Sequence, residues 1–317
     1  MRKRLTITAM KKMKQQNDPI SVVTAYDYPS AILSEEAGVD AILVGDSLGN
    51  VVLGYDTTIP VTLDDIIYHT KAVARGARNT FIVSDMPFMT YGVGRESTMR
   101  NAARIMQEGG AHALKLEGGA EIADDVRALV EAGVPVMGHL GLTPQSVHQL
   151  GGFKVQGKQP LEAEKLMEDA KALEQAGAFA IVLELITEPL AQAISSQLSI
   201  PTIGIGAGRG CDGQVLVYHD LLQYSSPNIP KKMVKAYADV GSVIRGALQS
   251  YVQEVKSRAF PAEEHSFGVI KPDTGSDNER TNLDTLDQLY GGKQEAAADK
   301  EKNREESASR DFVSNHS

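Results

Sequence analysis

The sequence predicts a (β/α)8 barrel of the TIM type, with an N-terminal helix before it and a disordered acidic C-terminal tail after it. Two observations favour this fold class: short, continuously apolar segments recur eight times, and segments with helical periodicity separate them. Continuously apolar strands are typical of parallel sheets, which are buried on both faces. Strand–helix alternation produces the parallel βαβ units of a barrel, which typically needs ~250 residues. An open doubly wound sheet is the main alternative, but the turn after the first strand lacks the glycines of a dinucleotide-binding fold.

Each apolar segment is a predicted strand. The strands are expected at residues 21–26, 41–44, 81–84, 113–116, 134–138, 180–183, 201–206 and 214–218. Apolar residues at helical spacing predict helices near residues 63–74, 99–106, 122–130, 166–173 and 190–198, and a long helix over 231–258. Thr62 and Asp65 have the spacing of a capping box for the first of these, and Met10 and Met13 belong to the apolar side of the N-terminal helix.

Composition limits the class of protein. The net charge of −9 argues against nonspecific nucleic-acid binding, which depends on lysine and arginine. No apolar segment reaches the ~18 residues of a membrane span, and no apolar region of a signal peptide follows the basic N-terminus. We therefore expect a cytoplasmic protein without a membrane partner.

The predicted domain organisation has three parts. Residues 1–267 form the catalytic barrel domain, residues 268–292 form a C-terminal segment that could dock as a helix, and residues 293–317 form a disordered charged tail. Residues 271–317 contain 11 acidic and 7 basic residues, and few large apolar residues occur after Gly292. Such a segment cannot bury enough apolar surface to offset the entropy of ordering.

Ionisable residues end seven of the eight predicted strands. They are Asp27, Asp46, Asp85, Lys115 with Glu117, His139, Glu184 and His219 with Asp220. A single aspartate at a strand end is usually a turn former or a helix cap. The whole set is better explained by catalysis, because catalytic groups of barrel enzymes come from the carboxyl ends of the strands.

The types of these residues indicate the chemistry. Asp46, Asp85 and Glu117 end consecutive strands, so their carboxylates should converge and repel one another unless a divalent cation is bound. Oxygen ligands favour Mg²⁺ over zinc, and Mg²⁺ leaves coordination positions for a chelating substrate. Lys115 lies two residues from Glu117 on one strand and could bind an anionic substrate group or simply form an ion pair with Glu117.

Glu184 lies in the apolar segment Ile181-Val182-Leu183-Glu184-Leu185-Ile186, where burial would make the carboxylate a stronger base. A buried structural glutamate paired with an arginine is the alternative. His139 by itself could be a structural histidine at a strand end. The glycine-rich turn at residues 204–213 could bind phosphate or only bring the backbone close to a ligand, and Cys211 within it is expected to be a small packing residue.

Taken together, the motifs resemble the ketopantoate hydroxymethyltransferase family. The matching segments are residues 24–27, 44–49 (VGDSLG), 57–62, 84–89 (SDMPFM), 115–119 (KLEGG), 138–145 (GHLGLTPQ), 154–157, 184, 204–208, 212–217 and 264–267. They occur in order over nearly all of residues 1–267. Asn50-Val51 depart from the family pattern, and the tail after Gly292 extends past its usual end.

The resemblance implies transfer of a hydroxymethyl group from 5,10-methylenetetrahydrofolate to 3-methyl-2-oxobutanoate, giving ketopantoate in pantothenate and coenzyme A biosynthesis. It implies a (β/α)8 barrel, a Mg²⁺ cofactor and a homodecamer of two pentameric rings. By position, the metal residues are Asp46, Asp85 and Glu117, the keto-acid contacts are Asp46, Ser47, Asp85 and Lys115, the proton acceptor is Glu184, and His139 is the active-site histidine.

Two other functions stay open on the sequence. The first is a Mg²⁺-dependent lyase or mutase of the phosphoenolpyruvate/pyruvate barrel type, which would act on a 2-keto acid without folate. The second is a non-catalytic barrel whose acidic tail recruits a partner.

Overall fold

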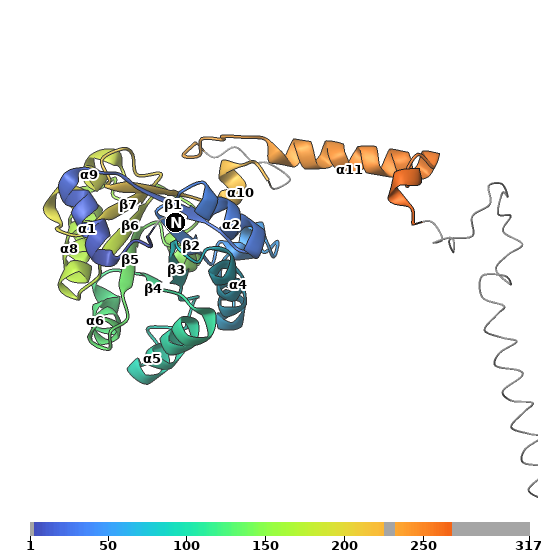
Figure 1. The fold of residues 1–317 in the computed structure, drawn as a ribbon. Helices are drawn as coiled ribbons and strands as arrows, with labels where there is room; N and C mark the ends of the chain where they lie inside the picture. Colours follow the sequence, from blue (N-terminus) through green and yellow to red (C-terminus); the bar gives the residue numbers. More distant parts are fainter. Residues whose placement is uncertain (1–2, 225–231, 268–317) are drawn as a thin grey trace, which may run out of the picture. The chain divides into compact units, whose positions relative to one another are not determined.

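The computed structural model describes residues 3–224 and 232–267, and within them eight strands close into a barrel in chain order (Figure 1). The strands are β1 (Ile20–Thr24), β2 (Ala41–Val44), β3 (Phe81–Asp85), β4 (Ala113–Glu117), β5 (Val136–Gly141), β6 (Ala180–Glu184), β7 (Thr202–Ile205) and β8 (Gly213–Leu216). Each strand is parallel to its neighbours, and β8 closes the barrel against β1. All carboxyl ends therefore lie at one rim, which confirms the predicted fold class.

The largest shift of a predicted strand concerns β5, which begins at Val136 and continues to Gly141. His139 therefore lies within the strand, where it is the register partner of Glu117 on β4 and of Val182 on β6. The longer ladder fixes the direction of the imidazole more firmly than a loop position would.

Most of the helices that come before α11 lie around the outside of the barrel (Figure 1). The α-helices are α1 (Ile7–Gln16), α2 (Tyr28–Glu36), α3 (Leu48–Val51), α4 (Leu63–Gly76), α5 (Arg95–Arg104), α6 (Ala123–Glu131), α7 (Val147–Leu150), α8 (Pro160–Gln175), α9 (Glu188–Gln197), α10 (Tyr218–Leu221) and α11 (Val240–Ser257). Short turns of other helix types are η1 (Ile105–Gly109), η2 (Ala120–Ile122), η3 (Pro144–Ser146) and η4 (Glu263–His265).

Two capping boxes determine where helices begin. The Thr62 side chain accepts from the Asp65 amide at 3.2 Å, and Asp65 accepts from the Thr62 amide at 2.9 Å, which confirms the predicted start of α4. Asp27 accepts from the Ser30 amide at 2.8 Å and caps α2 in the same way. The carboxylate of Asp27 therefore has a structural role, so the catalytic interpretation of strand-end residues does not extend to it.

The long helix predicted from residue 231 is wrong at its beginning. Residues 232–239 are not helical, and α11 begins at Val240. Asp239 accepts hydrogen bonds from the Ser242 amide and hydroxyl at 3.0 and 2.7 Å, so its side chain caps the first turn. The helix before Gly110 also begins earlier than predicted, at Arg95, and ends in the π-turn η1.

Two layers of apolar side chains build the core. One cluster fills the barrel between the amino ends of the strands, with Ile20, Phe81 and Phe179 among its members, and Met10 of α1 packs into it at 2% exposure. Another cluster lies between the strands and the outer helices. The N-terminal helix therefore closes the end of the barrel opposite the carboxyl rim.

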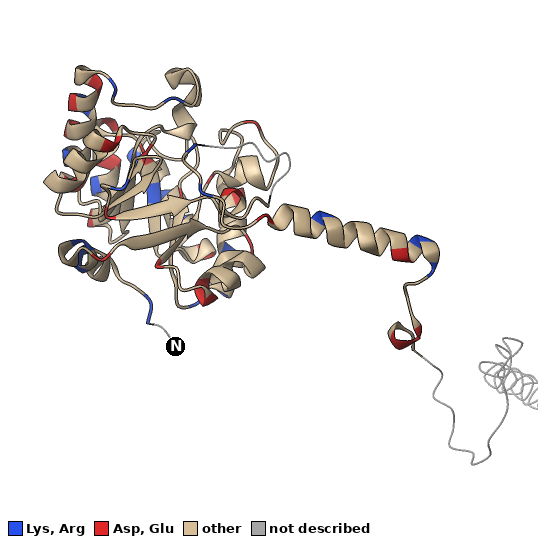
Figure 2. Cartoon of the chain, turned by 90° about the horizontal axis from the view of Figure 1, so that it is seen from above, with Lys and Arg blue, Asp and Glu red and all other residues tan. Residues whose placement is uncertain are grey.

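The chain divides into a compact unit over Met1–Gln253 and a second unit over Glu254–Ser317. Of the second unit, the structure describes the end of α11 and η4. The predicted docking segment 268–292 and tail 293–317 lie outside the described residues. Acidic and basic residues are interspersed over the helices of the barrel unit (Figure 2). No described helix has the length and apolar character to cross a membrane.

Candidate active site

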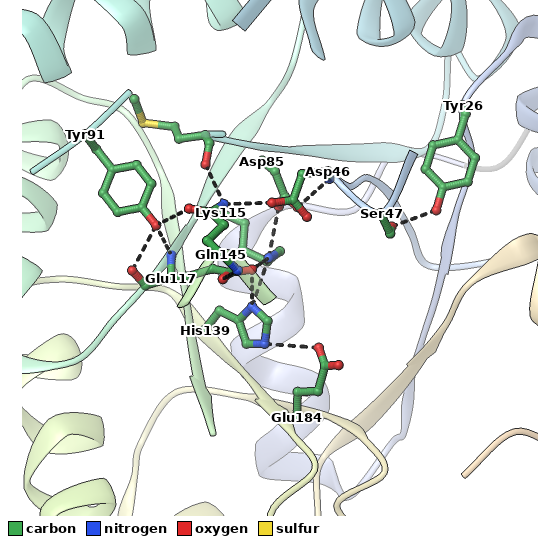
Figure 3. A network of polar contacts seen from close by, with 11 residues as sticks. Tyr26, Asp46, Ser47, Asp85, Tyr91, Lys115, Glu117, His139, Gln145 and Glu184 are labelled. Carbon is green, nitrogen blue, oxygen red and sulfur yellow. Dashed lines mark hydrogen bonds and ion pairs between the residues drawn. The ribbon is translucent and has the colours of Figure 1, made fainter. Parts of the chain in front are cut away.

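The structure brings the predicted site residues together at the carboxyl rim of the barrel (Figure 3). Asp46 and Ser47 follow β2, Asp85 ends β3, Lys115 and Glu117 lie on β4, His139 lies on β5 and Glu184 ends β6. Residues from five consecutive strands therefore form one network.

Asp46 and Asp85 are a buried pair of carboxylates. The Asp46 amide donates to Asp85 Oδ2 at 2.9 Å, and the two residues are 4% and 1% exposed. Burial raises the pKa of Asp46, and the charges of Asp85 and Glu117 raise it further. Burial also raises the pKa of Asp85, although Lys115 opposes this effect. Two carboxyl groups held in this way are stabilised by any cation placed between them.

Lys115 is a buried ammonium beside these carboxylates. Its Nζ lies 3.1 Å from Asp85 Oδ1 and 3.7 Å from Glu117 Oε1. Burial alone would lower the pKa of Lys115, but Asp85, Glu117 and Asp46 outweigh it and raise the pKa above its usual value. The structure therefore confirms the expected ion pair of Lys115 with Glu117. The binding of an anionic substrate group by this ammonium stays a prediction.

His139 lies between two carboxylates. Its Nδ1 is 3.1 Å from Glu117 Oε1, and its Nε2 is 3.3 Å from Glu184 Oε2. Burial and Lys115 lower the pKa of His139, but Glu117 and Glu184 outweigh them and raise it to about 9. The raised pKa favours the protonated ring, whose Nδ1 can donate to Glu117 Oε1. Lys115 Nζ also lies within hydrogen-bonding distance of the same Nδ1, at 3.1 Å.

Glu184 differs from the other carboxylates in its access to solvent. Its side chain is 15% exposed, whereas that of Glu117 is 3% exposed. The partner of Glu184 is a histidine, so the alternative of a structural glutamate paired with arginine does not describe this site. A carboxylate that is oriented by a histidine and still reachable is suited to accept a proton.

Ser47 is held at the edge of the site by Tyr26. The Tyr26 hydroxyl and Ser47 Oγ are 2.8 Å apart, and Tyr26 is 2% exposed. A Cβ atom at Gly45 would lie 2.9 Å from Ser47 Oγ and 3.4 Å from Asp85 Oδ2, so both side chains come close to the backbone there. Glycine at this position lets the hydroxyl approach the carboxylates.

Gln145 and Tyr91 belong to the site, although the strand-end pattern missed both. The side-chain Nε2 of Gln145 donates to Asp46 Oδ2 at 2.8 Å, and its backbone N–H donates to Glu117 Oε2 at 3.0 Å. The Tyr91 hydroxyl lies 2.8 Å from Gln145 Oε1. Gln145 ends the motif at residues 138–145 and could have been found there, whereas Tyr91 lies in a loop that carries no signal in the sequence.

The carboxylates do not form a ready-made three-residue metal site. Among the described residues, no group of three or more His, Cys, Asp or Glu side chains is arranged to hold a metal ion. Lys115 lies between Asp85 and Glu117, and Gln145 occupies one oxygen of Asp46. Asp46 and Asp85 nevertheless fit Mg²⁺, which binds proteins through one or two carboxylates and takes its other ligands from water or substrate.

A cavity of about 500 Å³ adjoins this network, a size typical of small-molecule sites. Tyr91, Glu117 and Gln145 line it, and Phe88, Met89 and Leu166 are among its apolar walls. A small molecule in the cavity would therefore contact Glu117 of β4 and Gln145, which follows β5.

The glycine-rich turn at residues 204–213 is shaped by close packing. Gly206 and Gly208 have φ values of +65° and +79°, and a Cβ atom at Gly208 would lie 2.4 Å from Glu188 Cγ. Cys211 is half-buried, and burial raises the pKa of its thiol, in agreement with the expected packing role.

Comparison with known proteins decides which family this site belongs to. The family model of ketopantoate hydroxymethyltransferase matches residues 4–263. The chain belongs to the ketopantoate hydroxymethyltransferase family. Among its relatives, the 3-methyl-2-oxobutanoate hydroxymethyltransferase of Bacillus cereus (strain G9842) is 58% identical, over 91% of this chain and 99% of the relative. The enzyme of the same name from Bacillus thuringiensis (strain Al Hakam) is 57% identical over the same shares.

Solved structures agree with the barrel fold of this ketopantoate hydroxymethyltransferase family member. A 2,3-dimethylmalate lyase of the PEP mutase/isocitrate lyase superfamily has a TM-score of 0.53 at 18% identity, over 93% of this chain and 98% of that chain. A phosphonopyruvate hydrolase in complex with oxalate and Mg²⁺ has a TM-score of 0.53 at 13% identity, over 92% of this chain and 96% of that chain. At such low identity these structures show the fold alone. The family is one of enzymes, so its match favours the predicted hydroxymethyltransferase over a non-catalytic barrel.

Proposed function

We propose that this chain transfers a hydroxymethyl group from 5,10-methylenetetrahydrofolate to 3-methyl-2-oxobutanoate and releases ketopantoate. Family membership and the printed name of the relatives support the reaction. The observation that carries the mechanism is the arrangement of Lys115, the Asp46–Asp85 pair and Glu184 around one rim, since a keto acid needs a cation for its carboxylate and a base for its C3 proton.

The keto acid would bind through its two oxygen-bearing groups. Lys115 offers an ammonium to the carboxylate, and Ser47 offers a hydroxyl at the edge of the site. Asp46 and Asp85 would hold Mg²⁺, with Glu117 behind them. The metal would supply Lewis-acid stabilisation of the negative charge that develops on the keto oxygen. The phosphonopyruvate hydrolase structure, which contains oxalate and Mg²⁺, is a precedent for such a ligand pair in this fold.

Glu184 would take the proton from C3 of the keto acid. His139 Nε2 lies 3.3 Å from Glu184 Oε2 and would keep this carboxylate turned into the site, while Glu117 contacts the other side of the ring. One of the two carbon–nitrogen bonds of the methylene bridge opens first, which leaves an iminium on the other nitrogen. The electron pair of the broken C3–H bond then forms the new bond to the methylene carbon, while the C=N electron pair returns to that nitrogen. Water then supplies the hydroxyl group as the remaining carbon–nitrogen bond breaks. The proton from C3 and one proton from water end on the two folate nitrogens, leaving ketopantoate and tetrahydrofolate.

A coupled assay tests this function. Purified full-length chain should form ketopantoate from 3-methyl-2-oxobutanoate and 5,10-methylenetetrahydrofolate, and chelation of Mg²⁺ should stop the reaction. Cleavage or isomerisation of a 2-keto acid without folate would instead support the lyase or mutase alternative. We also propose a cytoplasmic homodecamer, which sedimentation velocity would distinguish from a smaller assembly.

A further inference from the structure

We propose that Gln145 and Tyr91 are positioning residues that orient the Asp46 carboxylate for a divalent cation and thereby set the metal affinity. The inference rests on the proposed function in one respect, namely that Asp46 helps to bind Mg²⁺. It assigns the orientation of a carboxylate in the site to a glutamine and a tyrosine, neither of which is among the predicted strand-end residues.

Hydrogen bonds hold both the side chain and the backbone of Gln145. It is 5% exposed, and its Nε2 donates to both Asp46 Oδ2 at 2.8 Å and the Met86 carbonyl at 3.0 Å. Its backbone amide donates to Glu117 Oε2 at 3.0 Å. One residue of the loop after β5 thus links a carboxylate that follows β2 to one that ends β4, and the Asp85 strand lies between them.

Tyr91 determines which way the Gln145 amide faces. Its hydroxyl accepts from the Glu117 amide at 3.1 Å and has one proton to share between Gln145 Oε1 at 2.8 Å and the Glu117 carbonyl at 2.9 Å. The Tyr91 proton favours the carbonyl end of the glutamine amide on its own side, so the NH₂ group faces Asp46 and Met86. Without the hydroxyl, a flipped amide would place an oxygen against the Asp46 carboxylate, which would be repulsive.

The hydrogen bond to Asp46 has a consequence for metal binding. Gln145 engages Oδ2 and leaves the other carboxylate oxygen, Oδ1, for a cation. An aspartate held at one oxygen loses less rotational freedom when it binds a metal at the other. Residues that hold ligands in this way typically contribute 10–100-fold to metal affinity.

Three variants test the inference with Mg²⁺ alone as the probe, by calorimetric titration of full-length protein without substrate. Gln145→Met keeps the length and packing of the side chain but removes its polar groups, and we expect its Kd for Mg²⁺ to rise by about 10–100-fold. Tyr91→Phe removes only a hydroxyl and should raise the Kd by several-fold. In the double variant, Tyr91→Phe should add no further effect, because Tyr91 acts through Gln145.

Two matched substitutions serve as controls. Gln149 lines the same cavity and is exposed, so Gln149→Met should leave the Kd unchanged. Tyr68 is 73% exposed, and Tyr68→Phe should behave like the wild type. Raising the Mg²⁺ concentration should also restore the keto-acid turnover of Tyr91→Phe, which it would not do for a general loss of stability.

An unchanged Kd in both Gln145→Met and Tyr91→Phe would overturn the inference, as would a wild-type protein that does not bind Mg²⁺. Additive effects in the double variant would remove Tyr91 from the proposed role and leave Gln145 alone. A wild type that binds Mg²⁺ but forms no ketopantoate would contradict the proposed reaction and leave the positioning role standing. Since Tyr91→Phe is a minimal change, it keeps the test usable if Gln145→Met does not fold.

Discussion

Glu117 and His139 are register partners on β4 and β5, and their side chains meet at 3.1 Å on the carboxyl rim of the barrel. Burial favours the protonated form of Glu117, but His139 and Lys115 outweigh it and lower the pKa of this carboxyl. The same contact raises the pKa of His139. Both shifts favour an ion pair of carboxylate and imidazolium, and Nε2 of the same ring lies 3.3 Å from Glu184.

His139→Gln tests this orientation. We expect kcat to fall by about 10²-fold or more, because Glu184 loses the group that directs it, whereas KM for the keto acid should change little. Steady-state kinetics of the full-length enzyme would give both parameters. A large rise in KM at unchanged kcat would place His139 among the substrate contacts instead.

Glu184→Gln removes the proposed base and keeps its size. Turnover should be abolished, with a loss of at least the ~10²–10⁴-fold that a positioned base contributes, while binding of 3-methyl-2-oxobutanoate measured by calorimetry should persist. Glu188→Gln is the matched control, since that side chain is 48% exposed and pairs with Arg209. Loss of keto-acid binding to a similar degree would reassign Glu184 to the substrate or metal shell.

Lys115→Met separates a substrate contact from a purely structural ion pair. Binding of the keto acid should weaken by at least tenfold, about 1.4 kcal/mol. The free energy of unfolding should fall by about 3–5 kcal/mol, because Asp85 and Glu117 keep their buried charges without a partner. Urea unfolding measures the second effect, and Lys71→Met, which removes a 3.9 Å surface pair with Glu108, is the control. Unweakened binding with reduced stability would leave Lys115 only its structural role.

His112 should make stability depend on pH. Burial, with a smaller contribution from Arg4, lowers its pKa to about 4, and its Nδ1 accepts from the Ile82 amide at 2.9 Å. The unfolded chain binds this proton below pH ~6.5, so the unfolded state holds more protons between that pH and about 4. The free energy of unfolding should therefore fall as the pH is lowered through this window.

His112→Asn retains an acceptor but does not titrate, so its melting temperature should fall less than that of the wild type between pH 7 and pH 5. His148→Asn, at an exposed histidine, should follow the wild type. Equal pH dependence in His112→Asn and the wild type would contradict the prediction.

Deletion of residues 293–317 should leave ketopantoate formation unchanged, because all proposed site residues lie between Asp46 and Glu184. Asp46→Ala in the full chain should be inactive in the same assay. Loss of activity on deletion, confirmed with a second boundary at residue 300, would give the tail a part in catalysis or assembly.

The sequence by itself determined the barrel fold and most of the site residues at its carboxyl rim. Continuous apolar segments locate buried parallel strands, and in such a barrel the residue that ends each strand must face one rim, so Asp46, Asp85, Glu117 and Glu184 could be placed together without coordinates. The series of motifs added Ser47 to the predicted site and indicated the family.

Only the tertiary structure decided how these groups share their charges. His139 lies between Glu117 and Glu184, and Lys115 lies between Asp85 and Glu117. These contacts depend on strand register and on short distances, to which electrostatic energy is highly sensitive. Tyr91 reaches the site from a loop and Gln145 from the short turn η3, and neither segment has a periodic pattern in the sequence. Asp27, which the strand-end pattern included, caps helix α2 and is not part of the network. The pattern of strands in the sequence predicts which residues lie at the rim, whereas the contacts between these residues form only in the closed barrel.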